Sequence, residues 1–188
     1  ALAAGSSVVI KPAPQTPVCV EVTVAALHDA GIPREVLHVV RTDEDEIGQH
    51  LVAHPDVDTV VHLAGAGVGD RRWTPTYKML IRTSRVHGTD LVARVVAAGA
   101  GPTRLVTASA VGFYGDRGDE VLTEASAPGR TYLAGVVRDW EAAAAPAVAA
   151  GVPVAHARTG IVLAASMFPG IALVTPLFQL FGNLEWIG

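Results

Sequence analysis

The chain has 188 residues, enough for one ordinary domain with a sizeable core. Its net charge is -4 and its basic residues form no block, which argues against nucleic acid as a partner. The single cysteine, Cys19, excludes an internal disulfide framework, and no secretory signal is visible, so we expect a cytoplasmic protein.

Strands and helices are expected to alternate along the chain. The expected strands are short runs rich in β-branched residues, at 6–10, 36–40, 57–63, 104–108 and 153–156. The expected helices cover 17–30, 43–54, 77–99 and 132–150, the last one interrupted near Pro146. This alternation predicts an α/β fold with a Rossmann-like parallel sheet flanked by helices, in which the first four strands share one sheet.

Two further segments bear on membrane insertion and on metal binding. The apolar stretch 167–181 is too short to span a bilayer, so we expect it to be core or lid and expect no membrane partner. His50 and His54 have the spacing of metal ligands on a helix, but no third ligand accompanies them. We therefore expect no metal.

Several polar residues follow the ends of expected strands, where open α/β sheets bind ligands. Ser109 ends the strand LVTAS and could donate a hydrogen bond to a substrate carbonyl, or could cap a turn. Tyr114 could line the pocket or pack the loop. Arg158 could clamp a phosphate or carboxylate, or form a surface ion pair. The glycines of GAGVG (65–69) have the wrong spacing for GxGxxG and favour a tight turn.

The first third of the chain reads ALAAGSSVVIKPAPQTP, HDAGIP, VLHVV and IGQHLVAHPDVDTV in order. Residues 1–60 thereby resemble the coenzyme domain of the aldehyde dehydrogenase superfamily. The resemblance implies that Lys11 contacts the adenosine ribose of the coenzyme. The glutamate usual three residues later is Pro14 here, and Cys19 does not match the family's nucleophile.

The next hundred residues read VVHLAGAGVGDRRW, SRVHGTDLV, TASAVGFYGDRGDEVLTE, VVRDWEAAA and ARTGIVL. Residues 60–163 thereby resemble the atypical, epimerase-like branch of the short-chain dehydrogenase/reductase superfamily. The resemblance implies NAD or NADP as coenzyme, with Leu63, Ala64 and Gly65 beside its ribose or nicotinamide. It also implies that Ser109 is catalytic. From their positions beyond the strand ends, we expect Tyr114 and Arg158 to bind the coenzyme.

Tyr132 is the second catalytic candidate by this resemblance. Short-chain enzymes typically pair an acid/base tyrosine with a lysine four residues later, which lowers the tyrosine pKa from about 10. That position holds Val136 here, so we expect Ser109 to matter more than Tyr132. Atypical members of the branch also lack this lysine.

The strand VDTVVHLAG (57–65) satisfies both family patterns, so the chain looks like a fusion with its join at this strand. Short-chain enzymes begin with a strand and a GxxGxxG turn that binds pyrophosphate, and this chain has no such turn near its start. The neighbours of that missing central strand would either pair directly or leave the sheet incomplete. The first residue, Ala1, is not methionine, and we expect an excerpt or an incomplete gene product.

The expected function is that of an NAD(P)-dependent oxidoreductase or epimerase-like protein acting on a small molecule of unidentified structure. One alternative is an inactive fused or truncated product that binds coenzyme inefficiently. Another is an aldehyde dehydrogenase-like coenzyme-binding fragment. The missing pyrophosphate turn predicts weak coenzyme affinity in every case.

Overall fold

A computed structural model describes residues 1–13, 17–41, 50–99 and 104–160. Its strands are β1 (Val8–Ile10), β2 (Leu37–Val39), β3 (Thr59–His62), β4 (Arg104–Ala110) and β5 (Val154–Thr159). Its α-helices are α1 (Pro17–Asp29), α3 (Pro75–Ala98), α4 (Tyr132–Ala142) and α5 (Ala145–Ala149). Short 3-10 turns are η1 (Leu2–Ala4), η2 (Arg34–Val36) and η3 (Val111–Phe113).

Most expected elements occur where the sequence predicts them, with shorter strands at the start of the chain. Most of the helix expected at 43–54 and all of the stretch 167–181 lie outside the described residues. No helix in the described ranges is both long and apolar enough to cross a membrane. The elements that position the candidate site are therefore β3, β4, β5 and the helices between them.

The strands form two parallel sheets, so the prediction of one shared sheet is wrong. β1 pairs with β2, while β3, β4 and β5 form a separate sheet in that order. Paired strands lie about 4.8 Å apart. When one strand of a sheet is missing, the strands on either side of it therefore have no hydrogen-bonding partner on that side. The family resemblance places its missing strand between β1 and β3. Of the two expected outcomes, the described residues show the incomplete sheet.

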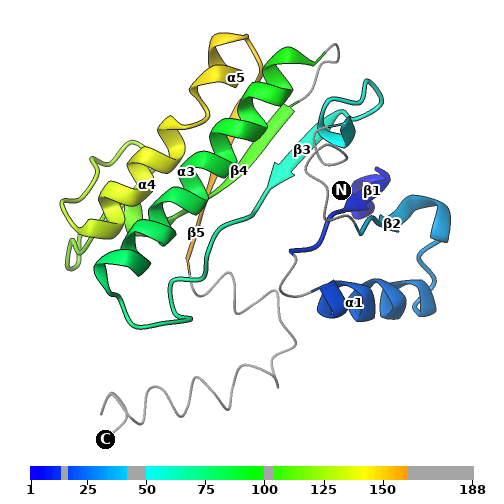
Figure 1. Cartoon of the computed structure of the whole chain (residues 1–188), viewed down its shortest axis with the longest axis horizontal. Coiled ribbons are helices and arrows are strands. Elements are labelled where there is room, and N and C mark those ends of the chain that lie inside the picture. The colour runs from blue at the N-terminus through cyan, green and yellow to red at the C-terminus, as the bar shows by residue number, and fades with distance from the viewer. Residues whose placement is uncertain (14–16, 42–49, 100–103, 161–188) are drawn as a thin grey trace, which may run out of the picture.

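Helices cover one face of the three-stranded sheet. α3 and α4 pack side by side against β4, and α5 packs on α3 (Figure 1). The small sheet and α1 lie beside this unit, with α1 packed on β2 (Figure 1). The other face of the larger sheet is less covered by the described residues, since Val61 of β3 is 57% exposed there. The candidate site therefore has one helical wall.

Helix α3 begins at a capped turn and buries a narrow stripe. The Thr74 side chain accepts a hydrogen bond from the Tyr77 amide, and Pro75 follows as the first helical residue. Ile81 is buried as the helical periodicity predicts, whereas Leu91 is 46% exposed. Thr89 is buried instead, because its hydroxyl accepts a hydrogen bond from the Trp140 indole at 2.8 Å. This contact ties α3 to α4.

The helical stretch that starts at Tyr132 is interrupted, as the sequence predicts. α4 ends at Ala142 and α5 starts at Ala145, with Pro146 in its first turn. Proline lacks an amide hydrogen and is tolerated in a first turn, so a new helix begins there. The break lets α5 bury Ala147 against Ala93 and Leu105, which form the core between helices and sheet.

The two separate sheets predict separate responses to core mutations. Leu105→Ala should remove about 2–5 kcal/mol of stability from the β3–β5 unit, because Leu105 is fully buried there. Leu37→Ala is the matched variant in β2, where Leu37 is 2% exposed. Hydrogen exchange followed by mass spectrometry should show loss of protection only in the mutated unit. Equal loss in both units for both variants would contradict this independence.

Candidate functional site

The carboxyl edge of the three-stranded sheet brings expected site residues together. Ser109 of β4 stands opposite Arg158 of β5 in the parallel register. Partners in register point to the same face of a sheet, and here this is the face covered by α4. Leu63 follows β3 at the same edge. Three strands thus contribute to one site.

Glu141 of α4 joins Ser109 and Arg158 into a hydrogen-bonded network. The Ser109 hydroxyl donates to Glu141 Oε1 at 2.6 Å. Arg158 donates from Nε and Nη2 to the two carboxylate oxygens, each at 2.8 Å. Ser109 is 2% exposed, and the Glu141 and Arg158 side chains are 13% and 20% exposed. Glu141 and Arg158 therefore form a largely buried, bidentate ion pair.

The electrostatics of this pair favour its charged form. Burial alone would raise the pKa of Glu141, but hydrogen bonds from Arg158 and Ser109 outweigh it and hold that pKa below its usual range. The Glu141 carboxylate in turn raises the pKa of Arg158 above its already high ordinary value. Both side chains are therefore ionised at neutral pH.

The third nitrogen of Arg158 is also occupied. Arg158 Nη1 donates to the Tyr114 hydroxyl at 2.9 Å and to the Glu124 carbonyl at 3.2 Å. The guanidinium lies over the Phe113 ring, 3.6 Å from its centroid. All three nitrogens of Arg158 thus have protein partners. The expected clamp on an external phosphate or carboxylate is filled by Glu141 in this structure.

Tyr132, the first residue of α4, lies instead on an open pocket. The pocket has a volume of about 400 Å³. Its lining comes from the segment before α3, from η3 and from the start of α4: Trp73, Val111, Gly112, Gly115, Asp116, Thr131, Tyr132 and Leu133. Tyr132 is 36% exposed, and its ring meets the Trp73 ring edge-on at 5.9 Å. Tyr132 is therefore accessible from solvent, whereas Ser109 is not.

A lysine lies beside Tyr132 although none follows it four residues later. Lys78 Nζ is 5.3 Å from the centroid of the Tyr132 ring. The Tyr132 hydroxyl also donates a hydrogen bond to the Lys78 carbonyl. Val136, at the family's lysine position, is buried against Tyr77 and Ile81. Lys78 of α3 thus lies near Tyr132, which has no lysine four residues after it.

The glycine-rich segment after β3 (residues 65–69) is hydrogen-bonded to side chains in and just before α3. One of its amides donates to the Ser84 hydroxyl at 3.1 Å. Its carbonyls accept hydrogen bonds from Arg85, Tyr77 and Trp73 at 2.8, 2.6 and 2.7 Å. A phosphate cradle uses free amides at a helix N-terminus, which this segment does not adjoin. The expected tight turn is not formed: the segment is irregular, no backbone hydrogen bond closes it, and side chains hold it in place.

The remaining expected coenzyme contacts lie in two places. Leu63, Ala64 and Gly65 are exposed just beyond β3, at the same edge as Ser109. Lys11 is exposed just beyond β1, in the other sheet, and has no hydrogen bond or ion pair to a described residue. Among the described residues no three His, Cys, Asp or Glu side chains gather as metal ligands would.

Glu141 and Lys78 are site residues that the sequence did not indicate. Glu141 is the last charged residue before the alanine run at 142–145 and follows Arg138 and Asp139, so nothing in the sequence singles it out. Lys78 is one of only two lysines in the chain, and it directly follows Tyr77 in the first turn of α3. No local pattern pairs either residue with its partner.

Two protein families match this chain. A model of the aldehyde dehydrogenase family matches residues 1–89, which extends past the expected boundary at residue 60. An epimerase family protein of Mycobacterium leprae is 45% identical over 109 residues, covering 58% of this chain and 35% of the relative. The chain thus spans about a third of the length of that curated relative. Both resemblances predicted from the sequence are confirmed.

Solved structures support the same fold class. A nucleoside-diphosphate sugar epimerase from Corynebacterium glutamicum is 41% identical, with a TM-score of 0.54, covering 66% of this chain and 28% of that one. A UDP-glucuronic acid 4-epimerase from Bacillus cereus, in complex with NAD, has a TM-score of 0.59 at 16% identity, covering 81% and 48%. The second likeness concerns the fold alone. The chain has the Rossmann-like α/β class that its sequence predicts.

The buried ion pair predicts a large stability loss in Glu141→Gln. Arg158 would lose its counter-charge, and breaking a buried pair at one partner costs about 3 kcal/mol. Glu120→Gln is the matched control, because the Arg117–Glu120 pair is more exposed and is worth less than about 1 kcal/mol. Urea denaturation monitored by tryptophan fluorescence at pH 7 would measure both. Equal losses would contradict the structural role of Glu141.

The same pair predicts a pH dependence. A carboxyl group with a lowered pKa stabilises the fold above its unfolded pKa of about 4.3, and loses this contribution as pH falls through the folded value. The stability difference between the wild type and Glu141→Gln should therefore shrink below about pH 4. A difference that is constant down to pH 3 would contradict the assignment.

Proposed function

We propose that this chain is a cytoplasmic, NAD(P)-dependent oxidoreductase of epimerase-like type that acts on a small molecule. The observation that carries the proposal is the pocket at the carboxyl edge of the sheet, where Tyr132 is accessible and Lys78 lies 5.3 Å from its ring. Open α/β sheets bind ligands at this edge. The epimerase relatives, which match more than half of the chain, support the same reading.

Tyr132 is the residue that we propose to contact the substrate as acid or base. A tyrosine beside a cation can take the proton of a substrate hydroxyl while the carbon bearing that hydroxyl gives up a hydride. Lys78 Nζ lies 5.3 Å from the centroid of the Tyr132 ring, so a positive charge stands next to this residue. The sequence ranked Ser109 higher, but its hydroxyl is buried and donates to Glu141. Ser109 is therefore proposed as a positioning residue that acts through Glu141.

The carboxyl end of β3 fits the nicotinamide side of a coenzyme. Leu63 is 67% exposed and offers an apolar surface for a ring. A Cβ at Gly65 would lie 3.1 Å from Arg85 Cγ, so glycine here makes room for the Arg85 side chain. Leu63, Ala64 and Gly65 would hold NAD or NADP there, and the bound coenzyme would supply the hydride acceptor. Contacts from Lys11, Tyr114 and Arg158 to the coenzyme stay predictions, and the last two are already bonded to each other.

A non-catalytic fused product is the second candidate. The specific observation in its favour is the absence of strand pairing between β1–β2 and β3–β5 in the described residues. An incomplete sheet with no glycine-rich pyrophosphate turn at its start would leave coenzyme without its strongest anchor. Coenzyme binding therefore discriminates the two candidates.

Weak coenzyme binding is the expected result for the full chain. Calorimetric titration with NADPH and NADH should give a dissociation constant above about 1 mM, the upper end of usual KM values, because the sequence has no GxxGxxG turn near its start to hold the pyrophosphate. Complete absence of saturable binding would favour the non-catalytic product. Micromolar binding would mean that another loop replaces the missing turn.

Substitutions at the pocket should separate the proposed roles. Tyr132→Phe should lower kcat by about 100-fold or more, the usual contribution of a general acid or base. Lys78→Met should lower kcat by about 10-fold and Lys78→Arg should recover most of it, because charge is what Lys78 supplies. Ser109→Ala should cost less than Tyr132→Phe. NAD(P)H absorbance measures the turnover, and a silent Tyr132→Phe with an inactive Ser109→Ala would reverse the roles.

A further inference from the structure

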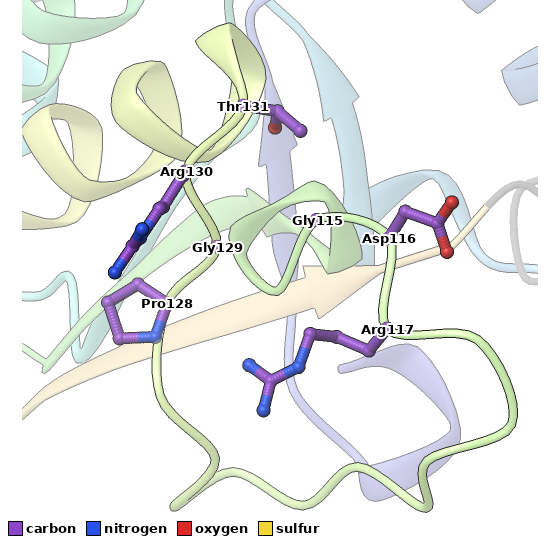
Figure 2. Close-up of a pocket in the computed structure, with 7 residues that line it drawn as sticks. All are labelled: Gly115, Asp116, Arg117, Pro128, Gly129, Arg130 and Thr131. Atoms are coloured by element: carbon purple, nitrogen blue, oxygen red, sulfur yellow. The ribbon is translucent and has the colours of Figure 1, made fainter.

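The arginines around the candidate site differ in the groups that hold them. Arg117 and Arg130 line a cavity of about 510 Å³ at the start of α4 (Figure 2). Arg158 is paired with Glu141. Arg85 of α3 is half-buried, yet it has no carboxylate partner among the described residues, although buried charges are usually paired. Its hydrogen bonds go to backbone carbonyls instead, so Arg85 holds main chain in place.

Ala66, in the glycine-rich segment after β3, has both of its backbone groups held by α3. The Ala66 amide donates to the Ser84 hydroxyl at 3.1 Å. The Ala66 carbonyl accepts from Arg85 Nη1 at 2.8 Å, and the same nitrogen donates at 3.0 Å to the Ile81 carbonyl, one helical turn earlier. Two successive side chains of α3 therefore fix a backbone unit that lies beyond the last strand pairing of β3.

Arg85 is packed as well as hydrogen-bonded. Its guanidinium carbon lies 5.1 Å from the centroid of the Trp140 ring in α4. A Cβ at Gly65 would lie 3.1 Å from Arg85 Cγ and 3.2 Å from Arg85 Cζ, which is tighter than an ordinary van der Waals contact. Glycine at position 65 thus leaves the space through which the arginine side chain reaches Ala66. The position of this segment is therefore set by α3 and α4 together.

The segment held by Arg85 begins at the carboxyl edge of the sheet, where open α/β sheets bind ligands. Leu63, which is 67% exposed, lies just before it and directly beyond β3. A loop that is already ordered loses less conformational entropy when a ligand binds to it. An arginine that orders this loop would therefore raise the affinity for coenzyme without contacting the coenzyme.

We propose that Arg85 is a positioning residue, which holds Gly65 and Ala66 so that the end of β3 offers a preformed surface to the nicotinamide side of the coenzyme. The part of this role that concerns coenzyme rests on the proposed function. The ordering of Ala66 does not, because it can be measured without coenzyme. The hydrogen bond from Arg85 Nη1 to the Ala66 carbonyl is the contact that carries the effect.

NMR on the full ¹⁵N-labelled chain tests both parts of the proposal. Arg85→Leu keeps an apolar stem and removes the donor. Hydrogen exchange of the Ala66 amide should become about 10-fold faster, since a hydrogen bond with a charged donor is lost. NADPH affinity, taken from the initial slope of amide shifts against NADPH concentration, should also fall by about 10-fold. Arg85→Lys keeps the charge and should recover part of both losses.

Arg82→Leu is the matched control. Arg82 is an exposed arginine of the same helix, and its hydrogen bond goes to Asp139 at 2.8 Å rather than to the glycine-rich segment. Because exposed ion pairs contribute little, this variant should change Ala66 exchange and NADPH affinity by less than about 2-fold. Equal effects of Arg85→Leu and Arg82→Leu would overturn the proposal.

A double-mutant cycle separates positioning from direct obstruction of the coenzyme at Gly65. Gly65→Ala should weaken NADPH binding by about 3-fold in the wild type, because the new Cβ displaces the arginine stem. In Arg85→Ala, where that stem is gone, the same substitution should change binding by less than about 2-fold. Equal losses in the two backgrounds would mean that the Cβ obstructs the coenzyme itself and would overturn the proposal.

The exchange measurement distinguishes failure of this proposal from failure of the proposed function. Unchanged Ala66 exchange in Arg85→Leu would overturn the positioning role, and so would faster exchange with unchanged NADPH affinity. A wild-type chain that does not bind NADPH, but whose Ala66 amide exchanges faster in Arg85→Leu alone, would reject the proposed function and retain Arg85 as the residue that orders this segment.

Discussion

The ion pair between Glu141 and Arg158 is the interaction on which the candidate site depends. It joins the end of α4 to the carboxyl end of β5, and the Ser109 hydroxyl adds the end of β4 to the same carboxylate. Desolvating two charges is costly, and a buried pair persists only where further hydrogen bonds satisfy its remaining donors and acceptors. Tyr114 and the Glu124 carbonyl supply those partners to Arg158.

This anchoring has a consequence for the other end of α4. A helix that is fixed on the sheet at Glu141 presents its first turn, with Tyr132, over η3 and the start of α3. There the ring meets Trp73, and Lys78 lies close to it. The buried network and the open pocket are thus two ends of one helix. Ser109 and Arg158 at the strand ends serve structure, and the accessible pocket lies just beyond β4, between η3 and the first turn of α4.

The second constraint is the missing central strand. Both families place a strand where β3 occurs, so this element forms and pairs with β4 in a regular parallel ladder. β1 and β2 also pair with each other, but no strand pairing in the described residues links them to β3. Each strand of a sheet is hydrogen-bonded only to its direct neighbours, so the absence of one strand divides the sheet in two. The residues that line the pocket all follow β3 in the chain, whereas Lys11 follows β1 in the other sheet.

Local patterns in the sequence by themselves determined most of the elements, the break near Pro146 and the parallel α/β class. These features depend on propensity and periodicity over a few residues. Only the tertiary structure decided that Arg158 pairs with Glu141, 17 residues away, and that Tyr132 meets Lys78, 54 residues away. It also decided that the strands divide into two sheets. Such contacts depend on how packed helices bring distant side chains together, which no local periodicity encodes.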